Sequence, residues 1–192
     1  ICMNYQYDVL IVGAGHAGCE AAFAAARSGS KTLLLTQSVE TIAAMSCNPA
    51  IGGTAKGHLV KEIDALDGLM AKAIDATGIQ FRVLNRKKGP AIWSSRAQAD
   101  MFLYSRFMKS ELEKIDNLHI KQDLVENLIL SKKQGLSYIQ GVEGKIFGKI
   151  YSKSVIITAG TFLNGLVHIG DKTIPAGRLG ASRSVNLAEF IK

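Results

Sequence analysis

The chain has 192 residues, of which 47% are hydrophobic and 20% are charged, and it contains 19 Gly and only 3 Pro. This composition excludes collagen-like, low-complexity and mainly disordered proteins, and no run approaches the roughly 18 apolar residues that a membrane span needs. The formal net charge of +7 favours association with phosphate-rich partners.

The first 36 residues predict a strand, a glycine turn, a helix and a second strand. Residues 7–12 are β-branched and aliphatic, which is typical of a buried parallel strand. The glycine-rich segment 13–18 follows at once, and residues 20–28 form an alanine-rich helix that Gly29 ends. With a second buried strand over 31–36, this order is a βαβ unit.

The middle of the chain is predicted to be mainly helical, because apolar residues recur there at helical spacing. The expected elements are a loop over 37–54, a helix over about 57–76 with a break near Gly68, a short strand over 79–84, a basic loop over 85–95 with the only Trp, and an amphipathic helix over 97–115.

After residue 117 the pattern changes to short strands joined by polar turns. The expected strands cover 118–120, 125–130, 137–142 and 145–151, followed by a buried strand over 154–160 and the start of a helix at Asn186. We therefore expect an α/β fold with a parallel sheet and a small antiparallel excursion over about 118–151. The end of the chain soon after Asn186 predicts an incomplete domain.

The segment Gly13 to Gly18 has the spacing Gly-x-Gly-x-x-Gly between a strand and a helix. In this motif Gly13 permits the tight turn, Gly15 lets the backbone approach a pyrophosphate, and Gly18 lets helix and strand approach closely. The free amides and positive dipole end of the helix then face the phosphates. The motif in this context predicts a dinucleotide site rather than a merely structural turn.

Two further features refine the kind of dinucleotide. The acidic residue expected to bind the ribose at the end of the second strand is replaced by Thr36 and Gln37, and the nearest acid is Glu40. Glu20, on the first turn of the predicted helix, is interpreted as a partner of that helix's dipole rather than a ligand. Residues 158–161, Thr-Ala-Gly-Thr, end a late strand after the excursion, where two-part flavin folds close on their cofactor. This feature favours a flavin over a nicotinamide.

The motifs taken together resemble one family of flavoenzymes, the tRNA uridine 5-carboxymethylaminomethyl modification enzymes, also called glucose-inhibited division protein A. The resemblance covers essentially the whole chain, and its most specific stretch runs from Cys47 to Glu62. The matching segments are 13–18 (GAGHAG), 46–53 (SCNPAIGG), 56–62 (KGHLVKE), 78–82 (GIQFR), 88–90 (KGP), 96–100 (RAQAD), 161–163 (TFL) and 168–170 (HIG).

The resemblance implies a glutathione-reductase-like FAD-binding fold, of which residues 1–192 are the N-terminal portion. The family's nicotinamide-binding insertion and C-terminal helical domain would be absent. It also implies which residues contact FAD: Gly13, Ala14, Gly15, His16, Ala17, Gly18, Val125 and Ser184. The match around Ser184 is looser than elsewhere. No metal site is predicted.

For the whole enzyme the resemblance implies FAD-dependent addition of a carboxymethylaminomethyl group at carbon five of a wobble uridine in tRNA. NADH would reduce the flavin, methylenetetrahydrofolate would supply the one-carbon unit, and a GTPase partner would form a heterotetramer with the homodimer. The location would be cytoplasmic, which agrees with three cysteines that form no CxxC pair.

Three cysteines differ in their expected roles. Cys47 is the candidate catalytic residue, because a thiolate suits addition to carbon six of a pyrimidine. Whether it acts as nucleophile or base stays open, and so does the alternative of a small buried thiol that fills the loop. Cys19 lies on the alanine-rich helix and is interpreted as core, and Cys2 carries no signal.

A group of basic residues has two interpretations. Basic residues around the middle of the chain either hold tRNA phosphates or a folate tail, or form a solvated basic face. They are Lys56, His58, Lys61, Arg82, Arg86, Lys87, Lys88 and Arg96. Trp93 either stacks on a base or anchors its loop.

Two alternative functions stay open. The first is a folate- and FAD-dependent tRNA methyltransferase or another flavin oxidoreductase that shares the glycine turn. The second is a non-catalytic truncated remnant that binds a partner or RNA through its basic surface.

Overall fold

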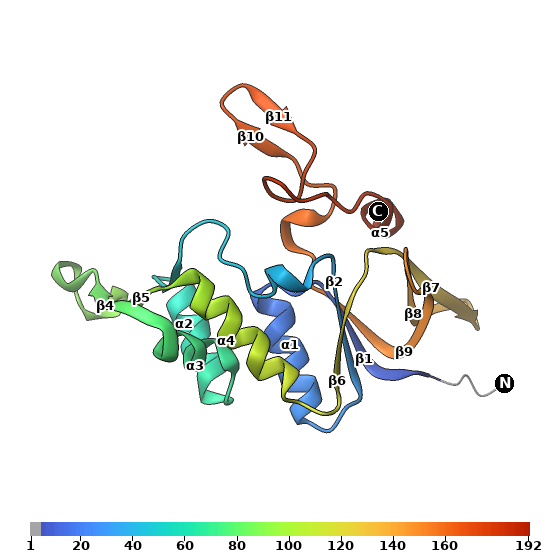
Figure 1. The fold of residues 1–192 in the computed structure, drawn as a ribbon, viewed down its shortest axis with the longest axis horizontal. Helices are drawn as coiled ribbons and strands as arrows, with labels where there is room; N and C mark the ends of the chain where they lie inside the picture. The colour runs from blue at the N-terminus through green and yellow to red at the C-terminus, as the bar shows by residue number, and fades with distance from the viewer. Residues whose placement is uncertain (1–4) are drawn as a thin grey trace.

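The computed structural model describes residues 5–192 (Figure 1), so Cys2 lies outside the described part of the chain. The helices are α1 (His16–Arg27), α2 (Lys56–Ala65), α3 (Leu69–Thr77), α4 (Met101–Glu113) and α5 (Asn186–Ile191). The strands are β1 (Tyr7–Val12), β2 (Thr32–Thr36), β3 (Ala50–Gly52), β4 (Gly78–Leu84), β5 (Ser94–Ala99), β6 (Leu118–Gln122), β7 (Val125–Lys133), β8 (Leu136–Gly144), β9 (Gly148–Ile157), β10 (Val167–Ile169) and β11 (Lys172–Ile174).

The central sheet has six strands in the order β6-β2-β1-β9-β8-β7. Strands β6, β2, β1 and β9 run parallel, and β8 and β7 continue the sheet antiparallel. The predicted α/β fold with a parallel sheet and an antiparallel excursion is therefore confirmed. In such a sheet ligands bind beyond the carboxyl ends of the parallel strands, which is where β1, β2 and β9 end together.

Both faces of β1 and β2 are buried, which explains their largely apolar sequences. Ile11 and Leu34 point into a core beneath α1, α3 and α4. Leu10 and Leu33 point into a second core with residues of β7, β8 and α5. In Figure 1 helices α1 to α4 lie on one side of the sheet, and α5 lies near β7. No helix within residues 5–192 is long and apolar enough to cross a membrane.

The middle of the chain differs from its prediction in two places. Residues 50–52, expected within a loop, form strand β3, which pairs with β5. The break near Gly68 is confirmed, because this residue is the N-cap of α3. The predicted helix over 97–115 begins only at Met101, and residues 97–99 instead end strand β5. The reason is Asp100, whose carboxylate accepts hydrogen bonds from the Phe102 and Leu103 amides and so caps the helix there.

The antiparallel excursion begins later than predicted. Residues 118–122 form β6, which pairs parallel with β2 and thus belongs to the main sheet. The excursion therefore starts at β7. The two strands predicted over 145–151 and 154–160 are one strand, β9, whose first part pairs with β8 and whose last part pairs with β1. The polar residues at its middle are held in the strand, since Ser152 is buried and Lys153 forms an ion pair with Asp8.

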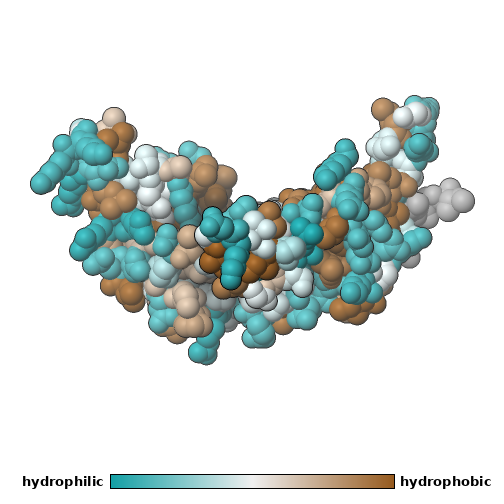
Figure 2. Space-filling model, turned by 90° about the horizontal axis from the view of Figure 1, so that it is seen from above, coloured by the Kyte–Doolittle hydropathy of each residue, from teal (hydrophilic) through white to brown (hydrophobic). Residues whose placement is uncertain are grey.

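Two smaller sheets lie outside this core. Strands β3, β5 and β4 form an antiparallel sheet, and β4 with β5 projects as an arm at the left of Figure 1. Strands β10 and β11 form a hairpin at the top of that view. Seen from above, the molecule is concave between its two ends, and the left end is covered largely by hydrophilic side chains (Figure 2).

Candidate functional site

The glycine turn between β1 and α1 is fixed by backbone hydrogen bonds from two neighbouring strands. Gly13 has a φ of +102°, which favours glycine, and its amide donates to the Leu35 carbonyl at 2.8 Å. Thr158 follows β9 and holds the turn from the other side. Its hydroxyl lies 3.0 Å from the Val12 carbonyl oxygen and 2.8 Å from that of Gly13. The turn is therefore rigid before any ligand arrives.

Gly18 and Gly15 are glycines for different reasons. A Cβ added at Gly18 would lie 1.7 Å from the Gly13 carbonyl oxygen and 2.7 Å from the Thr158 hydroxyl, so helix and strand approach too closely for any side chain. A Cβ added at Gly15 would meet nothing within 4 Å, and its φ of −72° is ordinary for any residue. The fold therefore requires glycine at position 18 but not at position 15.

The N-terminus of α1 presents unpaired donors at this turn. Gly15 is the N-cap and has no side chain to accept from the first amides. The first intrahelical bond runs from the Cys19 amide to the Gly15 carbonyl at 2.9 Å, so the amides of His16, Ala17 and Gly18 have no partner within the helix. Together with the helix dipole they form a site that suits an anion.

A cavity opens in front of the turn and extends along the ends of β1, β2 and β9. Its lining comes from all parts of the chain: Val12, Gly13, Ala14, Gly15, His16, Leu35, Thr36, Gln37, Thr41, Ala44, Ser46, Asp123, Leu124, Val125, Thr158, Ala159, Gly160, Thr161, Phe162, Arg178, Ser184 and Leu187. Among the predicted FAD contacts, only Ala17 and Gly18 do not line it. The segment Thr158 to Thr161 lines it, as the sequence predicted.

Val125 and Ser184 meet although 59 residues separate them. The Ser184 hydroxyl donates to the Val125 carbonyl at 3.3 Å, and both residues are buried. Backbone bonds hold Ser184 in place, because its amide donates to the Phe162 carbonyl and its carbonyl accepts from Asn164. The contact joins the last segment of the chain to the far wall of the cavity. That these two residues contact a cofactor stays a prediction.

The end of β2 lacks a free acid, as the sequence indicated. The Thr36 hydroxyl donates to the Ser38 carbonyl at 3.1 Å, whereas Gln37 lines the cavity. Glu40 is exposed and pairs with Lys109 at 3.3 Å, so it does not serve the cavity.

The acid that does line the cavity was missed by sequence reasoning. Asp123 is buried, and its carboxylate accepts from the amides of Leu124, Ile146 and Phe147 at 2.7 to 3.1 Å. These bonds hold the turn between β8 and β9. No local signal distinguishes Asp123 from an ordinary polar residue in a strand connection, since its partners in that turn lie more than twenty residues away.

His16 is neutral at physiological pH. Burial, and then the nearby positive charge of Lys56, lowers the pKa of His16 from 6.5 to about 4. Its Nε2 is buried without a hydrogen-bond partner in the described chain, and its ring lies 5.6 Å from that of Tyr104. His16 lines both this cavity and the neighbouring one that contains Cys47.

Cys47 lies in a second hollow that adjoins the first. The residues His16, Ala44 and Ser46 line both. The remaining lining of the second hollow is Met45, Cys47, Asn48, Ala50, Gly52, Lys56 and Arg96. Cys47 is exposed, so the alternative of a buried thiol that fills its loop is wrong. Two cations and a thiol thus share a hollow beside the glycine turn.

Cys19 is a core residue, as predicted. It is fully buried and lies 3.5 Å from the Ala14 carbonyl oxygen. Burial raises the pKa of the Cys19 thiol to about 12, which keeps it protonated. No group of three or more potential metal ligands occurs among residues 5–192.

The basic residues are divided between two places. Arg82 and Arg96 lie on paired strands, and Lys56 reaches the Cys47 hollow from the start of α2. Arg86, Lys87 and Lys88 lie at the tip of the arm, where Trp93 is 48% exposed and donates its Nε1 hydrogen to the Arg86 carbonyl.

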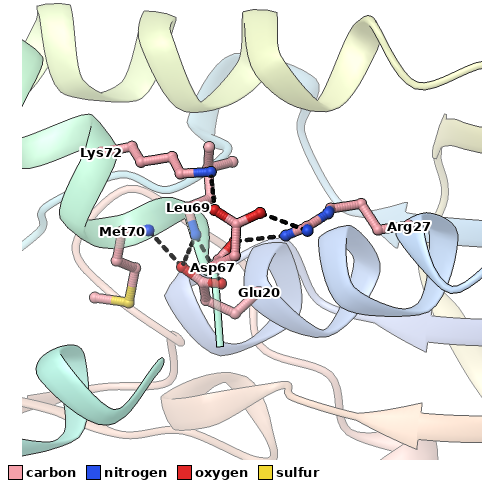
Figure 3. A network of polar contacts seen from close by, with 6 residues as sticks. All are labelled: Glu20, Arg27, Asp67, Leu69, Met70 and Lys72. Atoms are coloured by element: carbon pink, nitrogen blue, oxygen red, sulfur yellow. Dashed lines mark hydrogen bonds and ion pairs between the residues drawn. The ribbon is translucent and has the colours of Figure 1, made fainter. Parts of the chain in front are cut away.

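Glu20 serves a helix other than its own. Its carboxylate accepts hydrogen bonds from the Leu69 and Met70 amides and so caps the N-terminus of α3 (Figure 3). Beside it, Asp67 forms ion pairs with Arg27 and Lys72. The predicted role at the dipole of its own helix is wrong, because α1 has no acidic residue in its first turn and Glu20 instead serves the N-terminus of α3. The network fastens α1 to the α2–α3 pair and lies away from the cavity.

The geometry defines an α/β protein with an anion-binding glycine turn and a cavity at the ends of its parallel strands. A sequence model of the family described as glucose inhibited division protein A matches residues 8–192, and the chain belongs to this family. The central α/β architecture expected from the resemblance agrees with this membership.

The relatives confirm how far the likeness extends. The chain is 57% identical over 190 residues to the tRNA uridine 5-carboxymethylaminomethyl modification enzyme MnmG of Desulfotalea psychrophila, covering 99% of this chain and 29% of that protein. It is 56% identical over 187 residues to the protein of the same name from Thermodesulfovibrio yellowstonii, covering 97% of this chain and 29% of that protein. The chain thus spans less than a third of the length of these relatives.

Solved structures share the fold. A crystal structure of Aquifex aeolicus GidA superposes with a TM-score of 0.88 at 52% identity, covering 96% of this chain and 30% of that one. The GidA-related protein from Thermus thermophilus superposes with a TM-score of 0.69 at 24% identity, covering 96% of this chain and 67% of that one. The second likeness concerns the fold alone.

Proposed function

We propose that this chain is the FAD-holding part of an enzyme that modifies the wobble uridine of tRNA at carbon five. The name of the relatives at more than half identity supports the reaction. The observation that supports FAD as the cofactor is the open space in front of Gly15. The cavity beyond it extends over the ends of β1, β2 and β9, as nucleotide sites in such sheets do.

Gly15 is singular among the 19 glycines of the chain. Every other one either has a positive φ between +20° and +160° or would bring an added Cβ within 3.0 Å of a neighbouring atom. Gly15 has neither restriction. A glycine that the fold does not require is best explained by a ligand that occupies the space of the missing side chain, and a pyrophosphate against the α1 amides fits that space.

The residues of the cavity divide the work of holding FAD. The amides of His16, Ala17 and Gly18 donate to the pyrophosphate, Gln37 offers an amide group to the ribose, and Val125 with Ser184 forms the adenine-side wall. When bound, the flavin supplies the redox chemistry of the reaction. Ala159 and Gly160 lie at the end of β9, where a backbone without bulky side chains lets the cofactor approach.

Cys47 is proposed as the nucleophile that activates the uridine. Its sulfur forms a bond to carbon six, and the electron pair of the carbon five–carbon six double bond then develops on carbon five. Carbon five attacks the methylene carbon of the folate iminium, and the carbon–nitrogen π electrons move to the folate nitrogen. Carbon five then loses its proton to water, and the sulfur leaves as a thiolate while the carbon five–carbon six double bond re-forms. Lys56 and Arg96 supply positive charge at the same hollow.

The whole enzyme has further requirements that we propose for this protein by family membership. NADH reduces the flavin, methylenetetrahydrofolate supplies the one-carbon unit, and the enzyme works as a homodimer with a tRNA-modifying GTPase in the cytoplasm.

Measuring FAD uptake tests directly whether the open space at Gly15 holds the cofactor. The variant Gly15→Ser adds a side chain in the open space, yet serine is as good an N-cap as glycine, so folding is unaffected. We expect the unaltered protein to be yellow and to take up FAD, and Gly15→Ser to bind it at least ten times more weakly with the same thermal midpoint. Ala24→Ser, exposed on the same helix, is the matched control. Equal FAD affinity in Gly15→Ser would remove the basis of the proposal.

The reaction is tested in a strain that lacks its own modification enzyme. Mass spectrometry of tRNA should show the carboxymethylaminomethyl group restored by the intact gene and lost again with Cys47→Ala. Loss of ribosyl-thymine in the deletion strain, in place of the wobble modification, would favour the methyltransferase alternative. If the tRNA of the deletion strain stays without the carboxymethylaminomethyl group even when the intact gene is supplied, the non-catalytic alternative is favoured.

A further inference from the structure

Two arginines stand directly opposite each other on the arm. Arg82 of β4 pairs with Arg96 of β5, and the neighbouring pair of the same face is Gln80 with Gln98. Side chains two residues apart along a strand share a face, so these four lie together. With Leu84 they line a shallow hollow of their own.

This pairing is unfavourable for folding. Like charges directly opposite in an antiparallel pair destabilise a sheet. Within residues 5–192 neither arginine forms an ion pair with a carboxylate. Asp64 and Asp75 are exposed and line a cavity on the α2 and α3 side together with both arginines, but neither acid forms an ion pair with them. Arg82 and Arg96 therefore share one face of the arm without an ion-pair partner among residues 5–192.

Arg96 connects this hollow to the one that contains Cys47. It lines both, and in the second it lies near Lys56. The Lys56 ammonium donates to the Ala50 carbonyl at 3.2 Å, and partial desolvation followed by the charge of Arg96 lowers the pKa of Lys56. Three cations thus follow one track from the arm to the thiol.

We propose that a single-stranded RNA segment binds along this track, with consecutive phosphodiester groups held by Arg82, Arg96 and Lys56. The base between the phosphates at Arg96 and Lys56 then enters the Cys47 hollow. The planar guanidinium group matches phosphate oxygens in a bidentate manner, and Gln80 and Gln98 add amide donors beside it. The inference rests on the proposed function, because it assumes an RNA substrate at Cys47. It adds which side chains position the strand.

The test measures binding of a fluorescently labelled short oligouridylate to the intact protein over a series of salt concentrations. We expect Arg82→Gln and Arg96→Gln each to weaken binding about tenfold at low salt. Each should also make the slope of log K against log salt shallower by about 0.7 for every phosphate group that the variant no longer neutralises. Arg82→Lys should keep the slope while losing affinity, because it keeps the charge but not the bidentate geometry.

Arg106→Gln is the matched control, since Arg106 is exposed on α4 and lines none of these hollows. If Arg82→Gln and Arg96→Gln bind RNA as Arg106→Gln does, the inference is wrong. Displacement of the RNA by a short polyglutamate peptide as effectively as by unlabelled RNA would also overturn it, because the track would then recognise carboxylates.

Measuring FAD uptake in the same preparations distinguishes failure of this inference from failure of the proposed function. Normal FAD uptake with RNA binding that is insensitive to both arginines would refute the RNA track alone. Absent FAD uptake in the unaltered protein, with RNA binding that depends on both arginines, would refute the flavoenzyme and leave the track supported.

Discussion

The glycine turn and the β4–β5 arm meet near Cys47, but they present opposite chemistry. The turn offers backbone amides and no charged side chain, and its position is fixed by bonds to Leu35 and Thr158. The arm offers guanidinium groups and apolar side chains, of which Ile79 is 69% and Phe81 is 59% exposed.

The difference shows how far folding and binding can be separated by substitution. In the turn the fold requires glycine at positions 13 and 18 but not at position 15. On the arm the charged side chains point outward from a small sheet that β3 and the core residue Ala97 anchor. Substitutions at Gly13 and Gly18 should therefore change stability strongly, whereas substitutions at Gly15 and on the arm should change ligand binding first.

The largest effect is expected for Gly18→Ala. Its added methyl would overlap the Gly13 carbonyl oxygen, and backbone rather than a flexible side chain would have to move. Overpacking of this kind costs about 3 kcal/mol in the free energy of unfolding, even though alanine is the better helix former. Chemical denaturation measures it. Gly15→Ala is the control, because the same methyl three residues earlier meets nothing, and its loss should stay near the roughly 1 kcal/mol of a weaker N-cap.

The next effect is a dependence of stability on pH that His16 causes. The imidazole has a pKa of about 4 when folded and 6.5 when unfolded, so between these values the unfolded chain binds the extra proton. Stability from this group is therefore complete above pH 6.5 and falls as the pH drops toward 4, by roughly 2 to 3 kcal/mol. His16→Asn should flatten the curve in this window, and the exposed His58→Asn is the control for loss of one imidazole. Parallel curves for all three proteins would show that His16 titrates normally.

A smaller effect is expected where α1 is fastened to α3. Glu20→Ala removes the carboxylate that accepts from the Leu69 and Met70 amides, and losing such a cap costs about 1 to 2 kcal/mol. Thermal unfolding checks this, with Glu62→Ala as a control on the exposed side of α2. If both variants unfold alike, the cap contributes nothing beyond a surface charge. FAD uptake should be unchanged in both variants, since neither residue lines the cavity.

Elements that depend mainly on neighbouring residues in the sequence were predicted correctly from local patterns. The β1 strand, the glycine turn and the break at Gly68 follow from apolar runs and glycines, and they are confirmed. The start of α4 was misjudged because residues 97–99 carry alanines that favour a helix, whereas pairing with β3 and β4 holds them in a strand. Tertiary pairing overrides propensity at such boundaries.

Other features depend on register and on long-range contacts. Ser152, Lys153 and Ser154 have the composition of a turn, but pairing of β9 with both β8 and β1 keeps them extended. The position of Asp123 against the turn after β8, and of Arg82 opposite Arg96, depends on which residue faces which across the strands. A one-residue shift in register would place the two arginines on opposite faces. The sequence placed Arg82 in a predicted strand and Arg96 just after a predicted loop, and it did not predict that the two residues pair.

The smallest expected effect has the opposite sign to the others. Arg82→Gln relieves the repulsion between Arg82 and Arg96, so we expect the protein to gain about 0.2 to 1 kcal/mol in unfolding free energy at low salt. Added salt should abolish the gain, because it screens exposed charges. Thermal midpoints at low and high salt measure this, with Arg106→Gln as the reference for loss of one positive charge. A loss of stability in Arg82→Gln would mean that the aliphatic part of the arginine packs on the arm. Its contribution to folding alone would then explain why an arginine is present at this position. A gain in stability together with weaker RNA binding would mean that the arm keeps a charge that folding disfavours and a ligand requires.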